Sequence, residues 1–292
     1  MGVSTRLTQK RHQVRAIIVA ALVAFPHFGY SLLANTNFKD PQPEKSKPLT
    51  SVTTAIAVVA PGAEKLELSG RFKQDSTNYS DSIDWIVKSS EGAVVFVGAS
   101  QVLSLALKPG TYQVSGHYGN ASVAEAITLP PDTAVSINFV LNAGALRVAP
   151  HLTGESAAPQ PIDINFFTDT GQLIKTRVAA GEPVKLFAGT YRVETIYPSG
   201  NVVASTIVEV KAGITRAVDI SLHAGVVEFP LLSGGAVWIV TSNTGEKIIL
   251  LPSQTDAALT PGAYLAEAKL GNRLFSKSFT VQDGQSQRLT LD

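Results

Sequence analysis

The chain has 292 residues, of which 45% are hydrophobic and 16% are charged, and its formal net charge is +1. It contains no cysteine, which excludes disulfide scaffolds, thiolate zinc sites, iron–sulfur clusters, cysteine nucleophiles and a lipid anchor on an acylated cysteine. Because the charged fraction is low and the apolar fraction ordinary, we expect most of the chain to fold.

The amino terminus has the order of a secretory signal peptide. Residues 1–15 carry four basic side chains and no acidic one, and the apolar run 16–25 is followed by Pro26 and Gly29. This order predicts export, with cleavage after Ala34. Two alternatives stay open for residues 16–34: a single uncleaved membrane anchor with its basic end inside, or a buried helix of a soluble protein.

The segment that follows reads as a tether. Removing residues 1–34 takes away four of the 24 basic residues and none of the 23 acidic ones, which leaves a formal net charge of −3. No cluster of Lys and Arg remains, so we expect no nucleic-acid partner. Residues 35–64 begin with Pro41, Pro43 and Pro48 among polar residues and predict a Pro-rich tether. Within it, the Ala/Val run at 55–60 is either a first edge strand or linker.

A turn that leads into a strand occurs three times. Segments 107–114, 187–193 and 260–266 share a glycine followed two residues later by Tyr112, Tyr191 or Tyr264. After each tyrosine, apolar and polar residues alternate as in a half-buried strand. We therefore predict that the three tyrosines point into equivalent cores.

A large apolar residue marks the same period independently. Trp85, Ile164 and Trp238 lie 27, 27 and 26 residues before the three tyrosines, each in a strand-like run. We interpret them as core residues of three repeats.

The ends of the repeats also match. A closing strand, a short Ala-Gly link and an opening strand surround both Ala143-Gly144 and Ala224-Gly225. We therefore predict an all-β protein of three tandem small Ig-like β-sandwich units, at residues 65–142, 143–223 and 224–292. No convincing amphipathic helix follows residue 34.

The repeated element resembles known domains. Leu-x-Pro-Gly-x-Tyr-x-Val at 107–114, followed by the glycine-containing hairpins Gly119-Asn120, Gly200-Asn201 and Gly271-Asn272, is similar to bacterial Ig-like and transthyretin-like repeats, including carboxypeptidase-regulatory-like domains. The resemblance covers residues 65–292 and implies spacers, adhesion modules or add-ons to enzymes. The tyrosine also resembles the tyrosine corner of immunoglobulin domains, which implies a hydroxyl bonded to upstream backbone.

Few residues suggest chemistry. His117, His151 and His223 fall at non-equivalent positions, and we expect them to lie on the surface or near joints. No HExxH, GxSxG, P-loop or GxGxxG motif occurs. Asp163 and Asp219 lie singly on alternating strands and are expected to face outward, so no pair of carboxylates suggests a glycosidase.

Two further candidates have a functional and a plain interpretation. The loop 74–84 gathers three carboxylates, which could bind calcium but is more typical of a solvated acidic loop. Tyr118 and Tyr197 could form an aromatic binding surface, although their phase favours closure of the core.

The sequence thus predicts an exported, non-enzymatic envelope protein that acts as a structural spacer or protein-interaction module. The alternative is a periplasmic or surface protein that binds carbohydrate or peptide, and an enzyme is the least favoured class. No catalytic, cofactor-binding or metal-binding residue is predicted, and no cofactor. The expected partner is another envelope protein or a glycan, at a periplasmic or cell-surface location.

Overall fold

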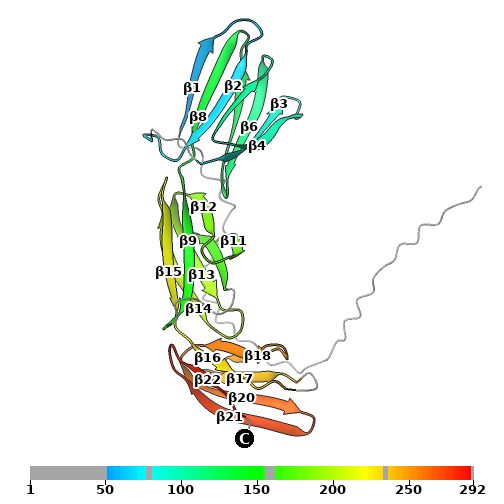
Figure 1. Ribbon diagram of the computed structural model, residues 1–292, viewed down its shortest axis with the longest axis vertical. Helices are drawn as coiled ribbons and strands as arrows, with labels where there is room; N and C mark the ends of the chain where they lie inside the picture. The colour runs from blue at the N-terminus through cyan, green and yellow to red at the C-terminus, as the bar shows by residue number, and fades with distance from the viewer. Residues whose placement is uncertain (1–50, 77–80, 155–161, 233–235, 291–292) are drawn as a thin grey trace, which may run out of the picture. The chain divides into compact units, whose positions relative to one another are not determined.

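The computed structural model describes residues 51–76, 81–154, 162–232 and 236–290 (Figure 1). Within these ranges the chain forms 22 β-strands and no helix, which confirms the predicted all-β class. Residues 1–50, which include the predicted signal or anchor and most of the tether, lie outside the described ranges. Among the residues that are described, none belongs to a helix long and apolar enough to cross a membrane.

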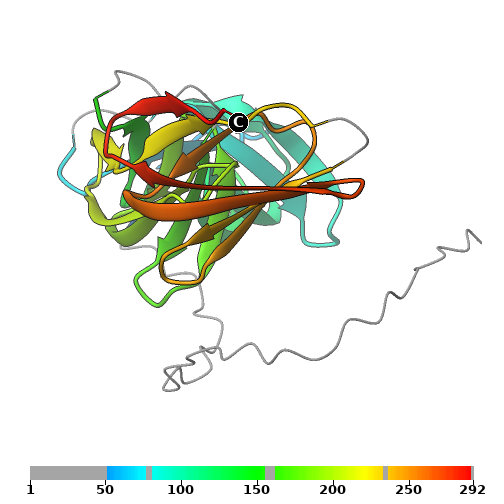
Figure 2. The same ribbon diagram turned by 90° about the horizontal axis from the view of Figure 1, so that it is seen from below.

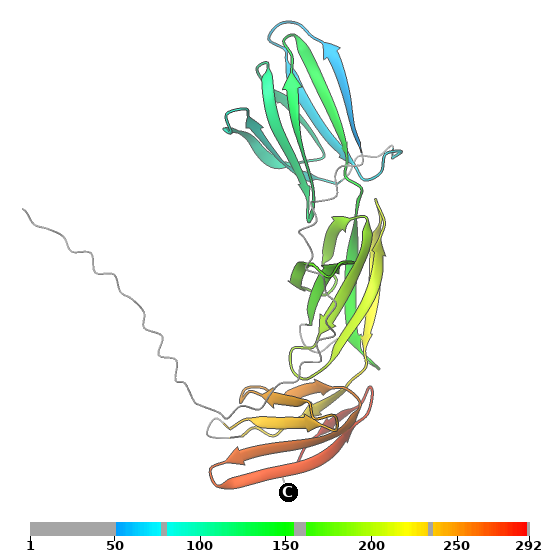
Figure 3. The same cartoon turned by 180° about the vertical axis from the view of Figure 1, so that it is seen from behind.

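The first two sheets, which we call sandwich 1, pack face to face. One sheet has the order β1-β8-β2-β5 and the other β4-β3-β6-β7. Figures 1 and 3 show the two layers from opposite sides. The strands are β1 (Ser51–Val58), β2 (Lys65–Arg71), β3 (Ile83–Ser89), β4 (Val94–Ser100), β5 (Val102–Ala106), β6 (Gly110–Tyr118), β7 (Ala121–Leu129) and β8 (Thr133–Val140).

Sandwich 2 repeats this arrangement without a counterpart of β1. Its sheets have the orders β12-β9-β15 and β11-β10-β13-β14. The strands are β9 (Ala143–Leu152), β10 (Asp163–Thr168), β11 (Leu173–Val178), β12 (Pro183–Phe187), β13 (Gly189–Ile196), β14 (Val203–Val210) and β15 (Thr215–Leu222).

Sandwich 3 has the same plan as sandwich 2. Its sheets have the orders β19-β16-β22 and β18-β17-β20-β21, and the long β20–β21 hairpin is drawn in orange to red in Figure 2. The strands are β16 (Gly225–Glu228), β17 (Trp238–Ser242), β18 (Lys247–Leu250), β19 (Asp256–Leu259), β20 (Gly262–Leu270), β21 (Arg273–Val281) and β22 (Ser286–Arg288).

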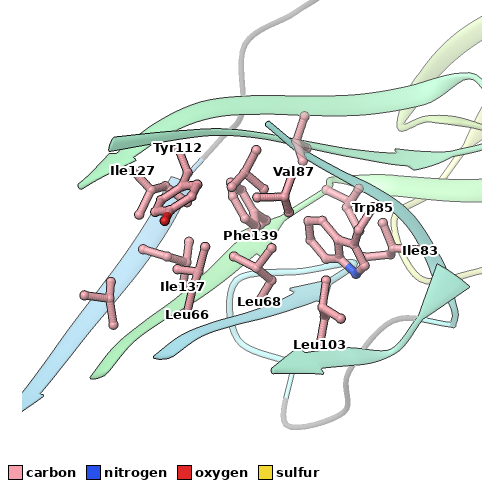
Figure 4. Close-up of a cluster of buried hydrophobic side chains, with 14 of the residues drawn as sticks. Leu66, Leu68, Ile83, Trp85, Val87, Leu103, Tyr112, Ile127, Ile137 and Phe139 are labelled. Atoms are coloured by element: carbon pink, nitrogen blue, oxygen red, sulfur yellow. The ribbon is translucent and has the colours of Figure 1, made fainter. Parts of the chain in front are cut away.

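The cores consist of the residues that the alternation predicts. Trp85, Ile164 and Trp238 are all buried, which confirms the landmark read from the sequence. In sandwich 1, Trp85 packs against Phe139 from the opposite sheet, with ring centroids 5.5 Å apart (Figure 4). Burial of such rings between two sheets is the main source of stability in a sandwich without disulfides.

The three repeated tyrosines make the same hydrogen bond. Each ring is buried, and each hydroxyl donates to the backbone carbonyl four residues upstream. The bonds are Tyr112 to Lys108 (2.8 Å), Tyr191 to Phe187 (2.9 Å) and Tyr264 to Thr260 (2.8 Å). The predicted burial of the three tyrosines is confirmed, and each hydroxyl bonds to upstream backbone as the resemblance to a tyrosine corner implies. The bond holds the turn before each strand against the core.

An extra strand distinguishes sandwich 1. β8, β15 and β22 are equivalent closing strands, and each pairs in parallel with the opening strand of its unit. In sandwich 1 the outer edge of β8 is covered by antiparallel β1, from Ser51 opposite Val140 to Val58 opposite Thr133. The run at 55–60 therefore contributes to an edge strand rather than only to a linker.

The sequence predicts a link at each Ala-Gly pair, but of these four residues Ala224 alone lies between strands. Gly144 lies in β9 and Gly225 begins β16. A Cβ atom on Gly225 would lie 2.6 Å from the carbonyl oxygen of Gln282, and a Cβ on Gly144 would lie 2.9 Å from that of Ile214. These glycines are needed because the turn before each closing strand crosses the opening strand at close range.

Candidate functional site: the joints between sandwiches

Successive sandwiches are joined almost without linker. β8 ends at Val140 and β9 begins at Ala143, and β15 ends at Leu222 while β16 begins at Gly225. Asn142 adopts a left-handed backbone conformation, with φ 46°, which turns the chain between the first pair of strands. With two connecting residues at each joint, neighbouring units have little freedom unless their contacts are lost.

We call the connection between sandwiches 1 and 2 joint 1, and that between sandwiches 2 and 3 joint 2. At joint 1, a hairpin tip of sandwich 1 lies on an edge strand of sandwich 2. Asn120, in the turn between β6 and β7, donates its backbone N–H to the carbonyl of Lys185 in β12 at 3.1 Å. A Cβ atom on Gly119 would lie 2.7 Å from the Cβ of Lys185, so this approach needs a glycine. The Lys185 ammonium lies 4.2 Å from the ring centroid of Tyr118, a cation–π distance.

Tyr118 is a buried part of this joint. Its ring packs on Phe72 with centroids 4.9 Å apart, and its hydroxyl donates to Asp81 at 3.2 Å. Burial, and then the negative charge of Asp81, raise the pKa of Tyr118 to about 12. Tyr118 is therefore neutral at physiological pH and closes the end of the core instead of presenting an aromatic surface.

At joint 2 a hairpin turn also contacts an edge strand of the next sandwich, with more hydrogen bonds than at joint 1. The turn between β13 and β14 lies along β19, where the N–H of Ala258 donates to the Ser199 carbonyl at 2.8 Å and the N–H of Asn201 donates to the Ala258 carbonyl at 3.3 Å. Gly200 and Ala258 form a parallel bridge. Asn201 also donates through its amide to Glu246 at 2.7 Å, and its amide oxygen accepts the N–H of Thr260 at 3.0 Å.

The two joints are equivalent in register. Lys185 lies six residues before Tyr191, and Ala258 lies six residues before Tyr264. In both joints, therefore, the asparagine of a Gly-Asn hairpin bonds to the same backbone position of the next unit. The sequence identifies these Gly-Asn pairs as hairpin turns, but their contact with the next sandwich was missed. Their recurrence at three equivalent places was the available signal.

Joint 2 also has its own apolar cluster. Tyr197, at the position equivalent to Tyr118, is buried there. The cluster combines residues from both sides of the joint: Leu152, Ile162, Tyr197, Val202, Leu222, Ala224 and Ala258. The favoured interpretation of Tyr118 and Tyr197 as core closure agrees with their burial, and the cores continue into the joints.

A polar cluster lies beside joint 2. The Nδ1 of His223 is 2.8 Å from a carboxylate oxygen of Asp283 and 3.3 Å from the hydroxyl of Thr153. The hydrogen bond from His223 is the largest influence on Asp283 and, with a weaker contribution from Thr153, it lowers the pKa of this carboxyl in spite of the opposing effect of desolvation. Because both the carboxylate and the hydroxyl contact the same ring nitrogen, the arrangement differs from a catalytic triad, in which a nucleophile and an acid contact opposite nitrogens.

The other residues considered from sequence are not brought together. His117 lies on β6 and His151 on β9, and no group of three His, Cys, Asp or Glu side chains within the described residues could hold a metal ion. Of the 74–84 loop, residues 77–80 lie outside the description, and Asp81 accepts the Tyr118 hydroxyl. Asp219 is exposed, and half-buried Asp163 lies 3.8 Å from Arg177.

Sandwich 3 has a surface hollow of about 790 Å³. It lies where β16 and β22 end, and the ion pair between Glu228 and Arg288, at 2.8 Å, forms part of its wall. Asp256 and Phe229 line it as well. The hollow therefore offers charges of both signs beside an apolar surface.

A row of four side chains crosses the outer face of sandwich 2, with Leu173 and Ile207 exposed and Phe167 and Arg192 half-buried. Leu173, Phe167, Arg192 and Ile207 are successive cross-strand neighbours on β11, β10, β13 and β14. The guanidinium carbon of Arg192 is 3.9 Å from the centroid of Phe167, and Ile207 is 74% exposed. We call these four residues the sandwich 2 row.

Comparison with known proteins finds distant structural neighbours but no related sequence. No family model matches the sequence, and no curated protein sequence matches it. Among solved structures, the Bacillus anthracis TIE protein is 13% identical over 77% of this chain and 49% of its own, with a TM-score of 0.26. A streptococcal ancillary pilin is 11% identical over 78% of this chain and 98% of its own, with a TM-score of 0.28.

A third neighbour is similar to the same degree. The shaft pilin SpaA of Lactobacillus rhamnosus GG is 11% identical over 59% of this chain and 97% of its own, with a TM-score of 0.28. The chain spans about half the length of the Bacillus anthracis protein. Scores at this level assign no role to this chain, and the proposals below are argued from its own contacts.

Proposed function

We propose that the chain is an exported, non-enzymatic envelope protein that acts as a structural spacer and protein-interaction module. The carrying observation is the construction of the joints: two connecting residues, and a Gly-Asn hairpin bonded to the edge strand of the next sandwich at both places. Units connected in this way support one another, as in linear repeat arrays, and hold their ends at a set separation.

The location is proposed from the amino terminus. The basic residues at 1–15, the apolar run at 16–25 and the cleavage position after Ala34 support export. The absence of cysteine in the sequence means that this export would need no disulfide formation. A fusion of the full chain to alkaline phosphatase, which is active only outside the cytoplasm, should be active. An inactive fusion would contradict export.

The spacer role is tested through the distance between sandwiches. Because the chain lacks cysteine, spin labels can be placed on introduced cysteines at exposed Ala126 in sandwich 1 and Ser276 in sandwich 3. Double electron–electron resonance should give one narrow distribution of the distance between the two labels. Gly200→Val should broaden it, since a side chain there would collide with the Ala258 carbonyl. A distribution already broad in the parent protein would reject the spacer.

A second function is favoured by the sandwich 2 row. A half-buried aromatic ring beside a cation and exposed aliphatic side chains is a surface that can bind a carbohydrate or peptide. Phe167→Ala and Ile207→Ser should then abolish retention by the envelope glycan or peptide that binds, while Ile249→Ser on sandwich 3 serves as the matched exposed control. Equal retention of all three variants would exclude the row.

A further inference from the structure

The two internal joints leave one equivalent donor and one equivalent acceptor unused in the described chain. The donor is the third Gly-Asn hairpin, Gly271-Asn272, between β20 and β21. The acceptor is β5, which corresponds to β12 and β19 and forms an edge of its sheet with β2 as its one neighbour within the described ranges. We propose that these two elements bind each other between copies, so that sandwich 3 of one molecule docks on sandwich 1 of the next.

The acceptor has the correct backbone direction. Ala106 lies six residues before Tyr112, as Lys185 and Ala258 lie before their tyrosines. Leu107 donates its N–H to the Glu64 carbonyl at 3.4 Å, so Lys65 and Ala106 form a non-hydrogen-bonded pair. The N–H and carbonyl of Ala106 consequently point away from β2, toward the open side of the sheet, and Ala106 is exposed.

The donor has the shape seen at joint 1. Gly271 has φ 59° and Gly119 has φ 62°, and each lies seven residues after the tyrosine of its repeat. A Cβ atom on Gly119 would meet Lys185, whereas a Cβ on Gly271 would meet nothing within 4 Å. The place that the next sandwich occupies at joint 1 is therefore open at the hairpin of sandwich 3.

The side chains at the donor also indicate a missing neighbour. Leu270 is equivalent to Tyr118 and Tyr197, which are buried at their joints, but Leu270 is only half-buried. Leu274, on the other side of the turn, is 67% exposed. An apolar tip of this kind is expected where a further unit would cover it.

The charges around the two elements are largely complementary. Lys269 and Arg273 flank the Gly271-Asn272 turn and are exposed. Glu64 and Asp132 lie beside the end of β5, and the N–H of Asp132 donates to a carboxylate oxygen of Glu64. The nearby basic residues are Lys108 and Lys65, the cross-strand partner of Ala106, and the Lys65 ammonium is paired with Glu67 at 2.7 Å. A basic tip against a mainly acidic acceptor adds orientation to the backbone bonds.

The amino-terminal strand leaves this acceptor open in the described part of the chain. β1 covers the opposite edge of the same sheet, next to β8, in the order β1-β8-β2-β5. The two surfaces that bind are different, so the contact is head-to-tail and not self-complementary. Copies can add in one direction, and the affinity is lower than inside the chain because no covalent link raises the effective concentration.

Disulfide trapping tests the contact in the full chain, which has no cysteine of its own. Ala106→Cys and Asn272→Cys are made in separate molecules and mixed under mild oxidation. The N···O distance of 3.1 Å at joint 1 brings the two backbones within the range of a disulfide. The mixture should give at least about tenfold more mixed dimer than Ala126→Cys with Asn272→Cys, because only the first pair is held together. The double variant Asn120→Cys/Lys185→Cys checks that the geometry can crosslink.

A second variant separates docking from chance collision. Gly271→Ala in the Asn272→Cys molecule should lower the yield with Ala106→Cys, since its Cβ would meet the acceptor strand. Gly245→Ala is the matched control, because Gly245 also has positive φ and open space around it. Equal yields for Ala106→Cys and Ala126→Cys, or an unchanged yield with Gly271→Ala, would overturn the proposal. Neither result depends on export, so the proposed location is tested separately.

Discussion

The hydroxyl of Tyr191 donates to the carbonyl of Phe187, four residues upstream, at 2.9 Å, while its ring fills the core of sandwich 2. The bond closes the turn between β12 and β13, and the same pair of roles recurs in the other two sandwiches. One residue therefore connects the edge strand that receives the preceding sandwich with the core behind it.

Substitution of Tyr191 separates these two roles. Tyr191→Phe keeps the ring and loses one hydrogen bond, so we expect it to cost about 1 kcal/mol of unfolding free energy. Tyr191→Ala leaves a cavity as well and should cost about 3–5 kcal/mol. Thermal and denaturant unfolding of both variants measure the difference, and stability of Tyr191→Ala close to that of the parent would reject the core role.

The same residue predicts sensitivity to alkali. Burial, and then the negative charge of Asp169, raise the pKa of Tyr191 from its ordinary value of 10.0 to about 12. A group that binds its proton more tightly when folded contributes stability that is full below pH 10 and is lost as pH rises through 12. Unfolding free energy should fall across that interval, and Tyr191→Phe should reduce the slope. An identical slope in both proteins would contradict the assignment.

The cluster at joint 2 predicts a shift at acid pH. The His223 hydrogen bond is the main cause that lowers the pKa of Asp283 below 3.8. Because this pKa is depressed in the folded state, its contribution to stability is present above the unfolded pKa and is lost as pH falls through the folded one. His223→Ala should raise the pKa of Asp283 in a carboxyl NMR titration, and Thr153→Val should raise it less. No change with His223→Ala would show that the contact does not form in solution.

Two strands of sandwich 1 should differ in how well they tolerate substitution. Ile56 on β1 is 61% exposed, whereas Leu66 on β2 of the same sheet is fully buried. Ile56→Lys should therefore change the unfolding free energy by no more than about 0.5 kcal/mol, as exposed substitutions usually do. Leu66→Ala should cost about 2–5 kcal/mol. Comparable losses of unfolding free energy in chemical denaturation would mean that the Ile56 side chain is packed in the core.

Much of the fold could be predicted because its signals lie in side chains. Alternation around Trp85, Ile164 and Trp238 identifies the strands, and the spacing to the tyrosines identifies the repeat. These patterns persist because each core must be filled by large apolar residues at fixed places. The bond from Tyr191 could be predicted for the same reason.

The backbone contacts at the joints could not be predicted, because backbone groups pair whatever side chains they carry. The carbonyls of Lys185 and Ala258 accept the asparagine N–H whatever side chains they carry. Gly-Asn is also an ordinary hairpin signal, so its second role is hidden in the first. The sequence predicts links at Gly144 and Gly225, because a close approach by another backbone segment has no signature in a single sequence.

The register of β1 determines how the molecule responds to tension. Ser51 lies opposite Val140, so the chain that precedes β1 and the chain that continues to sandwich 2 leave the pair at the same end. Force applied between the amino-terminal segment and sandwich 2 would load the hydrogen bonds at that end first and break them one after another. β1 would separate from β8 one hydrogen bond at a time, whereas the parallel β2–β8 pairing and the core behind it would remain intact. The first strand can thus lengthen the chain under load before any sandwich unfolds.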